Sequence, residues 1–212
     1  IILSLLLILI LSITCIYFLK NEEKFSTECT ISVDENGALV VQQNSGVCSN
    51  TALEFIFKQL IDISAITNLP NIETINLTEN QITSIPDLSN LTNLEELILE
   101  YNQITGEGIL NLSNLTNLES FTNLDLNNNK IDNITSLSNL TNLISLYLRG
   151  NKITDISALS NLKSLQHLDL YSNQINDITS LSNLTNLIRL YLGDNKITDI
   201  SALSNLKSLQ HL

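Results

Sequence analysis

Hydrophobic residues recur along most of the chain in one pattern, which is apolar–x–x–apolar–x–apolar–x–x–Asn. Complete copies start at Ile72, Leu94, Phe121, Leu143, Leu165 and Leu187, and a further copy starts at Leu209. Successive copies are 22 residues apart, except that 27 residues separate Leu94 from Phe121. A motif repeated at a fixed spacing predicts a solenoid, in which each copy packs only against its neighbours.

Each copy begins with the alternation of a short β-strand. Its first, fourth and sixth positions would point inward, and its third, fifth, seventh and eighth positions would point outward. After the asparagine, isoleucine and leucine recur about every third residue, a period that suits 3-10 or irregular turns and not an α-helix. The pattern therefore predicts an α/β-type repeat solenoid with a concave parallel sheet and a convex side of 3-10 or irregular turns.

The asparagine at the ninth position is a candidate structural residue. A buried amide there can satisfy backbone groups of neighbouring turns, so that stacked copies form a ladder. The predicted ladder consists of Asn80, Asn102, Asn129, Asn151, Asn173 and Asn195.

Residues 21–60 precede the regular copies and predict an N-terminal cap, which a solenoid needs to cover its first core layer. Two β-prone runs flank a turn that contains Asn36 and Gly37, so we expect a hairpin within residues 29–48.

A short helix is expected next, over residues 51–60. Residues 51–54 have the spacing of a capping box, and apolar residues follow at helical intervals. Residues 61–212 would then form the repeats, with the last copy truncated.

An almost unbroken apolar run occupies residues 1–19. A membrane span needs roughly 20 apolar residues, and the apolar part of a cleavable signal has about 7–15. Residues 1–20 therefore fit either a signal peptide or an uncleaved signal-anchor transmembrane segment. The residues before Cys15 faintly resemble a lipoprotein processing site, for which Thr14 is a poor fit.

Two cysteines, Cys29 and Cys48, lie outside this apolar run. Behind an export signal, such a pair predicts a disulfide in an oxidising compartment, where it would fasten the hairpin. The alternative is two buried thiols.

Charge is spread unevenly around a net value of −12. Residues 21–119 hold 15 acidic residues and two lysines, whereas residues 120–212 hold 7 acidic and 7 basic residues. This distribution argues against nucleic acid as a partner, because that would require a basic footprint. It suits a protein partner with a basic patch, although surface acids also serve solubility.

The outward strand positions hold every tyrosine after the apolar run, both arginines and both histidines. Interfaces are enriched in tyrosine and arginine, so these positions predict a protein-binding surface. Cross-strand pairing on a sheet surface is the alternative explanation. The predicted binding residues are Glu96, Ile98, Glu100, Tyr101, Asp125, Tyr147, Arg149, His167, Asp169, Tyr171, Arg189 and Tyr191.

A recent duplication supports a varied outward surface. Residues 133–168 and 177–212 are identical except at four pairs, and three of these four changes fall on outward strand positions. The four pairs are Asn133/Asp177, Ser145/Arg189, Arg149/Gly193 and Gly150/Asp194.

No pattern in the chain indicates catalysis or a metal. His167 and His211 would lie two strands apart, roughly 9–10 Å, which is too far to share one zinc ion. Asp125 begins a run like a calcium loop, but Lys130 replaces the required glycine and Ser136 the bidentate glutamate. We therefore expect no enzymatic activity, no metal and no cofactor.

Over about residues 60–212, the six complete copies resemble the leucine-rich-repeat family. Their 22-residue form, with Asn-x-Ile-x-(Asp/Ser/Asn)-Ile, is similar to bacterial internalins and to the leucine-rich regulatory subunit of protein phosphatase 1. The resemblance implies a horseshoe whose concave face binds a protein. The internalin likeness implies a cell-surface or adhesion protein, and the phosphatase likeness implies an intracellular regulatory subunit.

The resulting expectation is a non-enzymatic protein-binding module that is secreted or displayed at the cell surface. An intracellular regulator of an enzyme is the alternative, which the apolar run and the cysteine pair disfavour. The partner would be a protein, and the membrane would be contacted only through residues 1–19, if they stay uncleaved.

Overall fold

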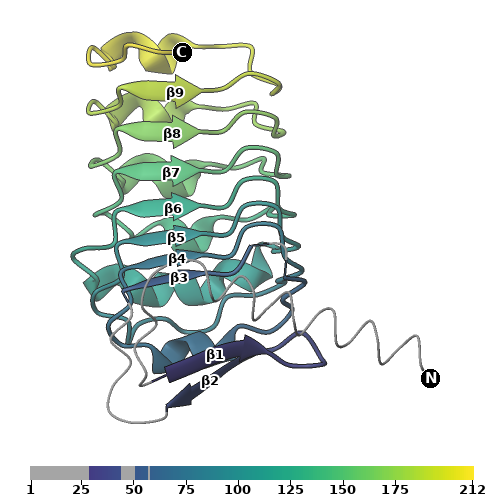
Figure 1. Ribbon diagram of the computed structural model, residues 1–212. Coiled ribbons are helices and arrows are strands. Elements are labelled where there is room, and N and C mark those ends of the chain that lie inside the picture. Colours follow the sequence, from purple (N-terminus) through teal and green to yellow (C-terminus); the bar gives the residue numbers. More distant parts are fainter. Residues whose placement is uncertain (1–28, 44–50, 57) are drawn as a thin grey trace.

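The computed structural model describes residues 29–43, 51–56 and 58–212. Seven short strands lie side by side in chain order and form one parallel sheet (Figure 1). This arrangement confirms the predicted repeat solenoid. The strands are β3 (Ala52–Glu54), β4 (Thr74–Asn76), β5 (Glu96–Ile98), β6 (Asn123–Asp125), β7 (Ser145–Tyr147), β8 (His167–Asp169) and β9 (Arg189–Tyr191).

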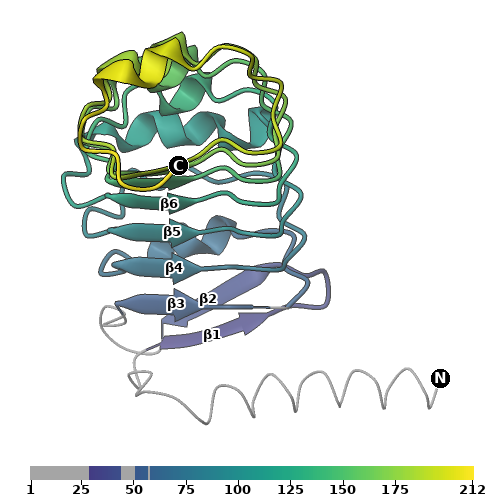
Figure 2. The ribbon, with the colours of Figure 1, turned by 90° about the horizontal axis from the view of Figure 1, so that it is seen from above.

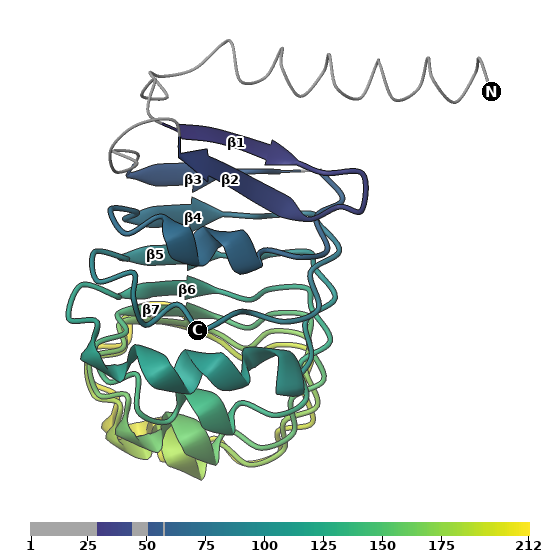
Figure 3. The same ribbon diagram turned by 90° about the horizontal axis from the view of Figure 1, so that it is seen from below.

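The return path of each repeat, except the one between β4 and β5, contains a 3-10 helix on the side of the solenoid away from the sheet (Figures 2 and 3). The three-residue spacing of apolar residues predicted this, because residues three apart share one face of a 3-10 helix. The helices are η1 (Ser64–Asn68), η2 (Glu107–Asn117), η3 (Thr135–Leu137), η4 (Ser157–Asn161), η5 (Thr179–Asn183) and η6 (Ser201–Asn205).

Helix η2 is the longest of these, and it occupies the 27-residue copy. It packs close to the preceding repeat at Gly108, where a Cβ atom would overlap the carbonyl oxygen of Thr83. The extra residues therefore lengthen the return path and leave the pairing of β5 with β6 intact.

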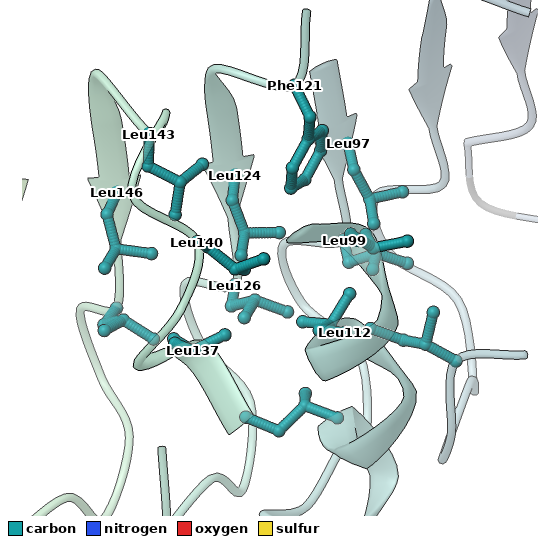
Figure 4. Close-up of a cluster of buried hydrophobic side chains, with 14 of the residues drawn as sticks. Leu97, Leu99, Leu112, Phe121, Leu124, Leu126, Leu137, Leu140, Leu143 and Leu146 are labelled. Atoms are coloured by element: carbon teal, nitrogen blue, oxygen red, sulfur yellow. The ribbon is translucent and has the colours of Figure 1, made fainter. Parts of the chain in front are cut away.

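Branched aliphatic side chains from both sides of the solenoid meet in its interior (Figure 4). The strand and the return path supply comparable numbers of them, which explains why every third position after the asparagine must be apolar. In one repeat, the side chains at most 1% exposed are Leu143, Leu146, Leu148, Ile153, Ile156, Leu159 and Leu162.

The chain turns away from each of strands β4 to β9 through a residue in the left-handed conformation, at the eighth position of the motif. Gly150, Asn128 and Asp194 are of residue types that tolerate this conformation, whereas Glu79, Tyr101 and Ser172 are not, so the stacked repeats impose the turn at those three positions. The residues are Glu79 (φ 56°), Tyr101 (φ 54°), Asn128 (φ 53°), Gly150 (φ 66°), Ser172 (φ 54°) and Asp194 (φ 55°).

The asparagines at the ninth position lie in a continuous ladder of hydrogen bonds. Asn151 is typical: its Oδ1 accepts a hydrogen bond from the Ile131 amide at 3.0 Å. Its Nδ2 donates to the carbonyl oxygens of Leu126 and Leu148, each at 3.0 Å. Ile131 and Leu126 belong to the preceding repeat, so each asparagine joins two copies. All of these asparagines except Asn195 are at most 9% exposed.

The expected helix over residues 51–60 is wrong, because Ala52–Glu54 forms strand β3. This strand pairs in parallel with β4, with Leu53 opposite Ile75. Leu53 and Phe55 are buried on either side of the exposed Glu54, an alternation of period two. The stack of repeats therefore begins one copy earlier than residue 61.

Backbone pairing with the next repeat explains why the strand wins over the helix. The Phe55 amide donates to the Asn76 carbonyl oxygen at 2.9 Å, and the Glu73 amide donates to that of Thr51 at 2.7 Å. A helix of one or two turns is unstable alone, so its capping-box spacing cannot compete with these bonds.

A two-stranded antiparallel hairpin precedes this first repeat, as expected within residues 29–48. It consists of β1 (Cys29–Val33) and β2 (Leu39–Gln43). Gly37 has φ 78° in the turn, and its carbonyl oxygen accepts a hydrogen bond from the Ile61 amide at 2.8 Å. The hairpin therefore joins the solenoid through backbone bonds to its first repeat.

Cys48 and residues 1–20 lie outside the described residues, so the disulfide and the export segment stay predictions. Among the residues that the structure describes, no helix is both long and apolar enough to cross a membrane.

Candidate functional site

The outward side chains of the seven-stranded sheet form one continuous surface, which we call the sheet face. It comprises the third, fifth, seventh and eighth positions of each motif copy. Strand register aligns these positions into rows across the sheet. All the predicted binding residues lie on it, and the row of fifth positions reads Ile98, Asp125, Tyr147, Asp169 and Tyr191.

Carboxylates gather on the sheet face over strands β3 to β6. The sheet-face positions of these four copies carry no lysine or arginine, and their acidic residues are Glu54, Glu79, Glu96, Glu100 and Asp125. Glu54 and Glu79 were not among the predicted binding residues. Glu54 was assigned to a helix, and Glu79 lies at an outward position of the first complete copy, from which no binding residue was predicted.

Asp125 is the most perturbed of these acids. Burial raises its pKa to about 6, and the negative charges of Glu100, Asp169 and Glu96 add to the effect. A hydrogen bond from the Asn127 amide to its Oδ1 at 2.9 Å opposes the rise. The carboxylates of this region therefore repel one another, and Asp125 is only partly ionised near pH 6.

A different arrangement lies over β7 to β9, where an aromatic ring is held between two neighbouring repeats. The guanidinium carbon of Arg149 lies 4.6 Å from the centroid of the Tyr171 ring, within the range of a cation–π contact. On the other side, a Cβ atom at Gly193 would lie 2.9 Å from Cε2 of Tyr171. Tyr171 fills the space that Gly193 leaves, and it is still 39% exposed.

The importance of Gly193 was missed by sequence reasoning. Arg149 and Gly193 occupy the same position in the two copies of the duplication. Their divergence puts a guanidinium on one side of Tyr171 and, on the other, a residue without a side chain, which leaves room for the ring. The sequence shows that positions 149 and 193 differ, but only the structure shows that the Tyr171 ring lies between them.

Asp169 and His167 lie beside this arrangement on β8. Burial raises the pKa of Asp169, whereas a 2.9 Å hydrogen bond from the Tyr171 amide and the charge of Arg149 lower it. Burial and the charge of Arg189 lower the pKa of His167, so its ring is neutral at pH 7. Among the described residues, neither side chain has a hydrogen bond to a nucleophile that it could activate.

Tyrosines supply most of the exposed aromatic surface of the sheet face. Tyr101 is 53% exposed and Tyr191 is 42% exposed, while Tyr147 is half-buried in its row between Asp125 and Asp169. Tyr101 stands apart from the others, two strands before Tyr147, and lines a shallow hollow with Gln59, Glu79, Asn80 and Gln81.

The two histidines do not lie side by side on the sheet face. His167 and His211 each pair with Arg189, on opposite sides of β9, and so lie two strands apart. No group of three or more His, Cys, Asp or Glu side chains in the described part of the chain could hold a metal ion.

Comparison with protein families identifies the repeats. Residues 55–104 match the family described as "Leucine rich repeat". Residues 141–183 and 185–212 match "Leucine Rich repeats (2 copies)". Together these matches cover more than half of the chain. Among curated proteins, none matches the sequence closely enough to count as a relative.

Several solved structures are similar to this solenoid. Internalin C2 of Listeria monocytogenes is 40% identical, with a TM-score of 0.69, over 76% of this chain and 70% of its own. The internalin InlF of the same organism is 36% identical, with a TM-score of 0.67, over 76% of this chain and 46% of its own. A leucine-rich-repeat protein of Leptospira interrogans is 27% identical, with a TM-score of 0.65, over 71% and 39%.

Proposed function

Because the chain belongs to the leucine-rich-repeat family, we propose that it is a non-enzymatic module that binds a protein partner on its sheet face. Leucine-rich-repeat proteins generally mediate protein–protein interactions. The chain spans about half the length of InlF, so this similarity does not assign the activity of a whole internalin to the chain.

The observation that carries this proposal is the fixed aromatic ring of Tyr171. Interface hot spots are enriched in tyrosine and arginine, and side chains that are already ordered lose less entropy on binding. Tyr171 is exposed yet held between Arg149 and Gly193, and Tyr191 is exposed on the next strand. A binding surface would need such pre-ordered contact area, whereas a surface serving only solubility would not.

We also propose that the protein is exported and either secreted or held at the cell surface. The support comes from the apolar run of residues 1–19, from the pair Cys29 and Cys48, and from the similarity to internalins. Residues 1–19 would anchor it if they stay uncleaved.

Affinity capture with the full chain tests the proposed binding face. Once a partner is isolated, Tyr171→Ala and Tyr147→Ala should each weaken binding by roughly tenfold or more, because central tyrosines typically contribute at least about 2 kcal/mol. The melting temperature should change little for Tyr171→Ala, since that side chain is exposed.

Lys163→Ala provides the matched control, because Lys163 is exposed just after helix η4 on the opposite side of the solenoid. It should leave both binding and melting unchanged. Loss of binding in the Lys163 variant with retention in both tyrosine variants would show that the partner uses the opposite side.

A further inference from the structure

The sheet face is electrically polarised along the solenoid. Over β3 to β6 it carries five carboxylates and no base. Over β7 to β9 it carries Arg149 and Arg189 together with Asp169 and Asp194, so this region has no net charge when His167 is neutral. The two regions lie on one continuous sheet, and a single ligand that crosses the strands would meet both.

Within the part of the chain that the structure describes, no basic side chain neutralises the carboxylates of the first region. No ion pair involves them in the described part of the chain, and Asp125 lies within electrostatic reach of Glu96, Glu100 and Asp169. Glu100 Oε1 accepts only a long hydrogen bond of 3.3 Å from Asn128 Nδ2. A cation from outside would relieve the repulsion among these groups.

Arg149 is the complementary feature of the second region. Its backbone amide donates to Asn127 Oδ1 at 2.7 Å, and its carbonyl oxygen accepts from Asn151 Nδ2 at 3.3 Å. Its guanidinium stacks on Tyr171 and, among the described residues, takes part in no ion pair and no hydrogen bond. This contact holds the guanidinium over the ring, and its N–H groups have no hydrogen-bond partner among the described residues, which suits binding of a carboxylate.

We propose that the partner presents an extended segment carrying charges of both signs, which lies across the strands with a basic side chain over Glu100 and Asp125 and an acidic side chain at Arg149. This inference rests on the proposed binding function and adds the chemistry and orientation of the ligand. Tyr171 and Tyr191 would contact the apolar part of the same segment.

The spacing of the two charges follows from the register of the sheet. Glu100 and Arg149 both occupy the seventh position, on repeats two strands apart, so they are separated by roughly 10 Å at a strand spacing of about 4.8 Å. An extended peptide advances about 3.3 Å per residue, so its basic and acidic side chains should be roughly two to four residues apart.

Peptide display against the full chain tests this inference without a known partner. The probe is a set of phage-displayed peptides of equal length and tyrosine content, in which the charged pair at a three-residue spacing is Lys–Glu, Glu–Lys, Lys–Lys or Glu–Glu. The wild-type chain should enrich one of the two mixed orders at least tenfold over the Lys–Lys class. The double variant E100R/R149E, which keeps the net charge, should enrich the opposite order.

The single variant R149E provides a second test that does not depend on the folding of the double variant. Arg149 is exposed, so R149E should fold. Its sheet face would keep Arg189 as the one arginine and would be more acidic, so enrichment should shift to the Lys–Lys class. Equal enrichment of the mixed and Lys–Lys classes by the wild type would overturn the inference, as would an order preference that survives the charge swap.

The same selection separates this inference from the proposed function. If binding disappears in Tyr171→Ala but does not depend on the order of charges in the peptide, the sheet face remains the binding surface and the ligand with charges of both signs is rejected. Binding that is unaffected by Tyr171→Ala and by both charge variants, or absent for all four classes, would count against both proposals.

Discussion

Replacing Asn151 with alanine should destabilise the solenoid by about 1–3 kcal/mol, the usual penalty for leaving a buried polar group without its hydrogen bond. Most of this loss of stability should come from one backbone group, the Ile131 amide. The Ile131 amide donates to Asn151 Oδ1 and to no other acceptor in the described residues. With alanine there, that N–H would be buried between two repeats without a partner.

The carbonyl groups served by Asn151 should contribute less to the penalty. Leu126 O also accepts from Asn129 Nδ2 at 3.2 Å, and Leu148 O also accepts from Asn173 Nδ2 at 2.9 Å. Each carbonyl oxygen therefore keeps a donor when Asn151 is removed. Only the Ile131 amide therefore loses its partner, and the expected loss of unfolding free energy stays within the range for one unsatisfied buried group.

Two measurements check this prediction. Chemical denaturation should show the lower free energy of unfolding, and hydrogen exchange should show faster exchange at the Ile131 amide, the atom that loses its acceptor. Asn161→Ala is the matched control, because Asn161 ends helix η4 in an exposed position and its side chain forms no hydrogen bond with any described residue. Asn142 is a poorer control, since its Nδ2 donates to Leu118 O at 3.4 Å.

Asn195→Ala tests whether the loss of stability depends on how deeply the asparagine is buried. Asn195 is more exposed than Asn151, so water can replace its hydrogen bond to the Ile175 amide and the loss of stability should be smaller. Equal losses for Asn151→Ala and Asn161→Ala, or unchanged protection at Ile131, would refute the assignment of the ladder as the link between repeats.

Two further predictions concern the acidic region and the cysteines. Burial raises the pKa of Asp125 to about 6 from 3.8, so the folded state binds its proton more tightly than the unfolded state, and stability falls as pH rises from about 4 to about 6. Asp125→Asn keeps the acceptor for the Asn127 amide, and should therefore raise stability by about 1–3 kcal/mol at pH 8 and by little at pH 4. Thermal melts of the variant and the wild type from pH 4 to pH 8 measure this gain. An equal gain in stability at pH 4 and at pH 8 would contradict the prediction. Mass spectrometry of natively produced, unreduced protein should find the peptides of Cys29 and Cys48 linked, and two free thiols would remove one support for export.

The repeat pattern alone predicted most of the fold. Alternating apolar positions, the fixed asparagine and the three-residue spacing of the return path each specify a local geometry, and the copies agree with one another. For this reason the parallel sheet, the 3-10 helices and the face on which Tyr171 and Arg149 lie could be read from the sequence. The candidate binding residues followed from the same periodicity, because outward positions are fixed once the inward ones are known.

The remainder depended on contacts between repeats, which a local pattern does not contain. Residues 51–54 have a helical signal, but they form β3 because the edge of β4 offers backbone bonds that outweigh a short helix. The raised pKa of Asp125 and the holding of Tyr171 between Arg149 and Gly193 arise from side chains in adjacent or nearby copies, 22 or more residues apart. Stacking brings these groups within a few ångströms, and only the tertiary structure decides which of them meet.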